Sequence, residues 1–167
     1  MKNGQEFELE LVESFSRMLG ICCEYSPSAQ IIYLYIVNED GMVYSDFATK
    51  IHGRIVRAGS TRSPDFSEDG YDDATDALTD EVFRLQHICE TRGTDVPTLI
   101  KLVFDVAAER LDSSIGYDQV TDPDSDISPN DLFRKWTDGF AIDAATWAIS
   151  PGDGAWPGLS SFPPPIP

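Results

Sequence analysis

Catalytic chemistry in this chain would have to come from its histidines, cysteines or carboxylates. His52 and His87 lie far apart in the sequence, and neither belongs to a catalytic motif. The sequence contains no Gly-x-Ser-x-Gly, no Gly-x-x-x-x-Gly-Lys and no His-Glu-x-x-His. Asp and Glu make up 29 of the 167 residues, so two carboxylates lying close together would be no evidence for an active site. We therefore expect a protein that is not an enzyme and holds no cofactor.

A metal site is the next chemical possibility. The run Asp-Pro-Asp-Ser-Asp over 122–126 resembles the start of a calcium-binding loop. Such a loop needs Gly and Glu further on, where this chain has Ile127 and Phe133. The three cysteines are scattered without the spacing of zinc ligands. We expect a solvated acidic loop and no metal, with a weak divalent-cation site as the alternative.

The carboxylates themselves are unevenly distributed. Twelve Lys and Arg residues against 29 Asp and Glu give a net charge of −17, which repels DNA, RNA and anionic lipid. Residues 65–81 hold eight carboxylates and residues 112–131 hold six, with no Lys or Arg in either stretch. Solvated loops that keep the protein soluble are the simpler interpretation for any one residue. The segregation instead favours a surface that meets a basic protein.

We expect ten residues of these two stretches to contact such a partner, the acids steering encounter and the tyrosines acting as anchors. They are Asp69, Tyr71, Asp72, Asp73 and Asp76 in the first stretch, and Tyr117, Asp118, Asp122, Asp124 and Asp126 in the second.

Hydrophobic periodicity and turn residues predict the elements that position these side chains. The patterns predict helices over 5–19, 72–92 and 128–139, and strands over 31–38, 42–48, 98–106 and 111–117. Gly20, Gly93 and Gly139 are expected to end the helices. The order of elements predicts an α+β fold in which a mainly antiparallel sheet of about five strands packs with three helices. We expect one domain over 1–149 and a Pro/Gly-rich tail over 150–167.

The segment from Lys50 to Arg62 is the one basic part of the chain. We interpret it as a further strand or an exposed ribbon that pairs with the protein's own acidic loops. The first residues lack the apolar stretch of an export signal, and no stretch approaches the ~20 apolar residues of a membrane span. We therefore expect a cytoplasmic protein.

A family resemblance covers roughly residues 5–140, and residues 76–136 carry its specific features. The helix over 76–93, the hairpin Pro97–Val106 with Leu111–Asp118, the acidic loop and the helix carrying Trp136 resemble the YezG-like immunity (antitoxin) proteins of bacterial toxin systems. The resemblance implies a cytoplasmic immunity protein that binds a secreted, nuclease-type toxin and has no catalytic residues. A small acidic secretion chaperone or adaptor that holds an effector is the alternative.

Overall fold

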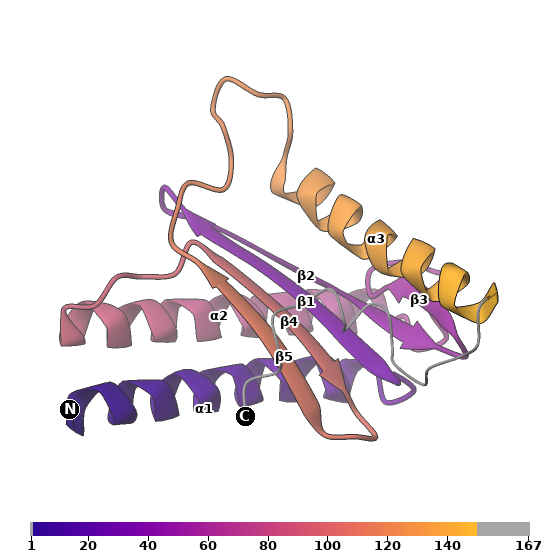
Figure 1. Ribbon diagram of the computed structural model, residues 1–167, viewed down its shortest axis with the longest axis horizontal. Coiled ribbons are helices and arrows are strands. Elements are labelled where there is room, and N and C mark those ends of the chain that lie inside the picture. The colour runs from indigo at the N-terminus through magenta and orange to yellow at the C-terminus, as the bar shows by residue number, and fades with distance from the viewer. Residues whose placement is uncertain (1, 150–167) are drawn as a thin grey trace.

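Five antiparallel strands form one sheet in the order β3-β2-β1-β4-β5 (Figure 1). The computed structural model describes residues 2–149. The strands are β1 (Ile31–Glu39), β2 (Met42–Ile51), β3 (Arg54–Arg57), β4 (Leu99–Asp105) and β5 (Arg110–Gly116). Three helices complete the fold: α1 (Lys2–Tyr25), α2 (Glu68–Arg92) and α3 (Pro129–Ile149). The α+β class with a five-stranded antiparallel sheet and three helices is as predicted.

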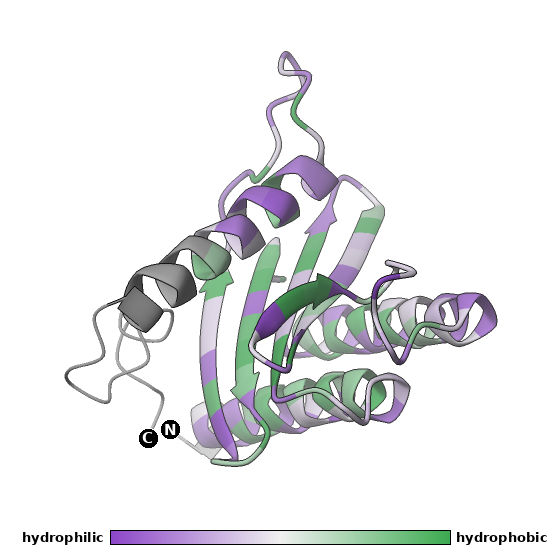
Figure 2. Ribbon diagram, turned by 90° about the vertical axis from the view of Figure 1, so that its right-hand side faces the viewer, coloured by the Kyte–Doolittle hydropathy of each residue, from purple (hydrophilic) through white to green (hydrophobic). Residues whose placement is uncertain are grey.

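Strand β1 lies in the middle of the sheet and is buried on both faces. Ile32, Leu34 and Ile36 face the cluster formed with α1 and α2, whereas Tyr33 and Tyr35 face the cluster formed with α3. This alternation explains the continuous apolar run of the sequence, because neither face of β1 meets water. Figure 2 shows the apolar residues along the strands between the two helical layers.

Helices α1 and α2 run antiparallel over one face of the sheet (Figure 1). Phe15, Met18 and Leu78 are among their fully or almost fully buried side chains, and burial of each such side chain stabilises the fold by about 1.5–3 kcal/mol. Gly93 ends α2 in the left-handed conformation at φ 67°, as the sequence predicts. Ser67 caps its start, so α2 begins earlier than the predicted residue 72.

Helix α3 covers the other face of the sheet over β1, β2 and β3. Its aromatic side chains stack against those of β1: the ring centroids of Tyr35 and Trp136 are 5.6 Å apart, and those of Tyr33 and Phe140 are 4.8 Å apart. Ser128 Oγ accepts from the backbone N–H of Asp131, and the Asp131 carboxylate accepts from Ser128, which is the predicted helix start.

Two of the three predicted helix ends are wrong. Gly20 lies inside α1, which continues to Tyr25, and Gly139 lies inside α3, which continues to Ile149. A glycine inside a helix costs only about 1 kcal/mol of stability relative to Ala. Burial of a residue such as Cys22, which follows Gly20, stabilises the helix by more than that. Strand β2 also runs past the predicted residue 48. The tail predicted over 150–167 lies outside the described residues.

Candidate protein-interaction surface

The first predicted contact group lies on the N-terminal half of α2. Its aspartates Asp69, Asp72, Asp73 and Asp76 are all exposed. We call these four residues the α2 acidic patch. None of them forms an ion pair with another described residue. Asp69 alone of the four lies in the first turn of α2, where the free backbone N–H groups favour negative charge.

Tyr71 lies beside this patch but serves the fold. Its side chain is half-buried, and its hydroxyl donates to Oδ1 of Asp46 at 2.9 Å. The ring also packs at the edge of Tyr25, with centroids 6.2 Å apart. Burial, and the neighbouring Asp46 carboxylate, raise the pKa of Tyr71. The hydroxyl is thus used within the protein, and the α2 acidic patch presents no exposed aromatic anchor of the predicted kind.

Asp46 is a half-buried carboxylate that the sequence analysis did not single out. It accepts from the Tyr71 hydroxyl and, at 2.8 Å, from the backbone N–H of Phe47. Desolvation raises the pKa of Asp46, and these hydrogen bonds partly oppose that shift. The Asp46–Tyr71 contact joins α2 to β2 and fixes where the α2 acidic patch stands.

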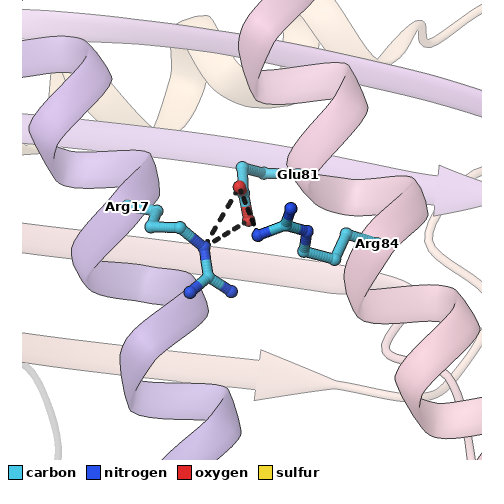
Figure 3. Close-up of polar contacts among 3 residues, drawn as sticks. All are labelled: Arg17, Glu81 and Arg84. Atoms are coloured by element: carbon cyan, nitrogen blue, oxygen red, sulfur yellow. Dashed lines mark hydrogen bonds and ion pairs between the residues drawn. The ribbon is translucent and has the colours of Figure 1, made fainter.

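The last carboxylate of the first acidic stretch is also part of the fold. Arg17 Nε lies 3.1 and 3.0 Å from the two carboxylate oxygens of Glu81, and Arg84 approaches Glu81 at 3.7 Å (Figure 3). The Glu81 side chain is only 13% exposed. Neutralising bases therefore come from α1 and from the next turn of α2, although the stretch 65–81 itself contains none.

The second predicted contact group lies on the connection between β5 and α3, which projects from the sheet (Figure 1). Asp118, Asp122, Asp124 and Asp126 are exposed there, and Tyr117 is 50% exposed. Within the described part of the chain, these aspartates form no ion pair. The backbone N–H of Asp124 donates to the Asp122 carboxylate at 2.9 Å, a turn that orders the loop.

Glu39 fastens this loop to the sheet. Glu39 is 9% exposed. Its carboxylate accepts hydrogen bonds from the backbone N–H of Val120 at 3.2 Å and from both the N–H and the hydroxyl of Thr121 at 3.1 Å. Charge-assisted hydrogen bonds of this kind are stronger than neutral ones. The sequence analysis left Glu39 between the strands predicted over 31–38 and 42–48 and missed this role, because the donors lie about eighty residues further along the chain.

A groove of about 550 Å³ lies next to the loop. The turn residues Asp40 and Gly41 border it on one side, Phe83 and Gln86 of α2 on another, and Gln119 of the loop on a third. The Phe83 side chain is 49% exposed, so it offers apolar area at the border of this groove. We use the term loop surface for Tyr117, Asp118, Asp122, Asp124 and Asp126 with the neighbouring Asp40 and Phe83.

The two predicted contact groups do not form one continuous surface. Helix α2 begins at the side of the molecule where β3 lies, whereas the loop projects beyond the Glu39 end of β1 (Figure 1). The α2 acidic patch also borders a hollow, of about 380 Å³, through Asp73, but the aromatic side chain that lines it, Tyr25, is half-buried. The loop surface combines exposed carboxylates with the exposed aromatic side chains of Tyr117 and Phe83 and a larger groove. That combination is the one expected of a protein-binding site.

The residues considered for other chemistry are dispersed. His52 lies in the β2–β3 turn and His87 on α2, while all three cysteines are free thiols. Burial raises the pKa of the Cys22 thiol, which disfavours the reactive thiolate. Among residues 2–149, no three His, Cys, Asp or Glu side chains are placed to hold one metal ion. None of the described helices has the length and apolar composition needed to cross a bilayer.

No protein-family model matches this chain, and no curated protein matches its sequence.

Proposed function

We propose that this protein is a cytoplasmic immunity protein that neutralises a secreted bacterial toxin by stoichiometric binding and catalyses no reaction itself. The observation that carries the proposal is the loop surface. Four exposed aspartates that form no ion pair with a described residue follow Tyr117 in the β5–α3 loop, and Gln119 of the same loop borders the groove that Phe83 also lines. The resemblance of residues 76–136 to YezG-like immunity proteins supports the same function.

The partner of this surface is a toxin with a basic substrate cleft, of the nuclease type. A cleft that receives phosphates attracts carboxylates for the same electrostatic reason. Exposed aspartates contribute little affinity each, but together they raise the rate of encounter. Phe83 and Tyr117 supply the apolar area that holds the complex once it has formed.

The α2 acidic patch plays a secondary part in this proposal. It carries the same charge, but it stands apart from the groove and its neighbouring tyrosine is occupied by Asp46. We therefore expect the patch to add to long-range attraction without entering the interface. Charge reversal there should slow association slightly and leave dissociation unchanged.

The test is rescue of growth by co-expression with a toxin encoded beside this protein, followed by association kinetics of the purified pair. Reversal to Lys of Asp118, Asp122, Asp124 and Asp126 should lower the association rate at least about tenfold and abolish most of its salt dependence. The matched control reverses the four aspartates of the α2 acidic patch. Full protection by both variants would overturn the proposal.

A secretion chaperone or adaptor is the second candidate, and the groove beside Phe83 is the observation that favours it. A chaperone would hold a non-toxic targeting segment of its effector in that groove. An immunity protein instead binds the folded toxic domain and stops its activity. Binding to separately purified toxin segments distinguishes the two functions.

A further inference from the structure

Three arginines that form no ion pair with another described residue surround a hollow at the edge of the sheet. Arg54 and Arg57 belong to β3 and Arg62 to the turn that follows; with Ser60 they border a hollow of about 430 Å³. The sequence analysis expected such basic residues to pair with the protein's own acidic loops. That expectation is wrong for these three, since none lies within ion-pair distance of a described carboxylate.

These arginines lack ion pairs with described residues although the protein has a large excess of carboxylates. The chain carries 29 carboxylates, yet Arg54 and Arg62 are left exposed to solvent. Arg57 is half-buried and lies near enough to Asp46 to lower the pKa of that carboxyl, but forms no ion pair with it. A local positive charge therefore remains at one edge of a strongly negative molecule.

Backbone groups that bond to no other described residue also border this hollow. β3 is an edge strand, and a two-residue turn connects it to β2, with Ile51 paired to Arg54. Hydrogen-bonded and non-hydrogen-bonded pairs alternate from that turn, so the N–H and C=O of Ile55 and the N–H of Arg57 point away from β2. The view in Figure 2 is from this side of the molecule and shows β3 in front of the other strands.

We propose that the outer edge of β3 binds an extended acidic segment of a partner protein, which adds to the sheet as a sixth strand. The backbone of such a segment satisfies the outward groups of Ile55 and Arg57, and its carboxylates bind Arg54 and Arg62. An isolated oxyanion would use the guanidinium groups but leave the Ile55 carbonyl facing a negative charge. A second copy of this chain would place arginines against arginines.

This site is distinct from the loop surface and does not depend on the proposed function. β3 is at one edge of the sheet, whereas the loop surface lies beyond the Glu39 end of β1. The two sites also have opposite charge, so they select different segments of a partner or different partners.

The probe is a fluorescein-labelled hexapeptide of alternating glutamate and valine, titrated with the full-length protein and followed by fluorescence anisotropy. The double variant R54E/R62E should weaken binding at least about tenfold, because two attractive contacts become repulsive. The matched control R134E/K135E makes the same change of charge at two exposed positions of α3 and should leave binding unchanged. Circular dichroism confirms that each variant is folded. If R54E/R62E is unfolded, the single loop variant R62E takes its place in the titration.

Two further measurements separate strand addition from plain charge attraction. A peptide of equal charge with proline in place of valine lacks the alternate N–H groups and should bind at least about tenfold more weakly. Amide exchange at Ile55 and Arg57 should slow when the acidic peptide is bound. Equal binding of the two peptides, equal binding to R54E/R62E, or displacement of the peptide by equimolar inorganic phosphate would each overturn the proposal.

Discussion

Removal of the Glu39 carboxylate is expected to release the β5–α3 loop and destabilise the protein. In the variant E39A, the two backbone N–H groups of Val120 and Thr121 and the Thr121 hydroxyl lose their acceptor. A hydrogen bond to a charged group contributes about 1.5–3 kcal/mol, but part of this is recovered as water reaches the freed donors. We expect the free energy of unfolding to fall by about 2–4 kcal/mol, or about 5–15 °C in Tm.

The comparison of E39Q with D40N isolates the hydrogen bonds from the loss of charge. Both substitutions remove one negative charge from the same turn, but Asp40 is exposed, whereas Glu39 is 9% exposed. E39Q retains one acceptor oxygen and turns an N–H toward the loop donors, so we expect a loss of about 1–2 kcal/mol. D40N should stay within about 0.5 kcal/mol of the wild type.

Urea unfolding followed by tryptophan fluorescence measures these differences, and amide exchange at Val120 and Thr121 reports the loop directly. Exchange there should accelerate in E39A by more than the loss of global stability accounts for, because the loop is freed before the sheet unfolds. An E39A midpoint equal to that of the wild type, with unchanged exchange at both amides, would refute the role given to Glu39.

Three further predictions concern Gly59, Gly20 and Asp46. A Cβ at Gly59 would lie 2.9 Å from the Tyr71 ring, so Gly59→Ala should lower the free energy of unfolding by about 1–3 kcal/mol. A Cβ at Gly20, inside α1, would meet nothing within 4 Å, so Gly20→Ala should raise the free energy of unfolding by up to about 1 kcal/mol. Thermal unfolding measures both changes. Desolvation raises the pKa of Asp46 above 3.8, so the folded state favours the protonated carboxyl. The free energy of unfolding of the wild type, relative to that of D46N, should therefore be greatest below pH 3.8. It should fall as the pH rises through the raised pKa. Unfolding in urea at a series of pH values checks the sign, and the opposite trend would contradict the assignment.

Local sequence signals predicted most of the elements correctly because neighbouring residues decide them. The Asp40-Gly41 turn, the Gly93 helix end and the Ser128 cap each depend on backbone conformation or hydrogen bonds within a few residues. Gly20 misled the prediction because its effect is small beside the tertiary packing of the last turn of α1. Where packing and local preference compete, the sequence alone does not show which is stronger.

The interaction surface was less predictable because it depends on distant pairs. Asp118 to Asp126 were singled out from their charge alone, and their predicted contact with a partner stays a prediction. Glu39, Phe83 and the Arg17–Glu81 pair were missed, because their neighbours come from other elements. A count of charges along the chain also overestimated the negative charge of the first acidic stretch, because an arginine 64 residues away neutralises Glu81.

The position of β1 between β2 and β4 has a consequence for synthesis of the chain. β2 follows β1 directly, but β4 is made only after the whole of α2. During that interval the most apolar strand has one open edge, which is a template for pairing with other chains. Helix α1, which is made first, contacts β1, but the edge of β1 stays open until β4 is made, so a ribosome that pauses before β4 is complete exposes the nascent protein to aggregation.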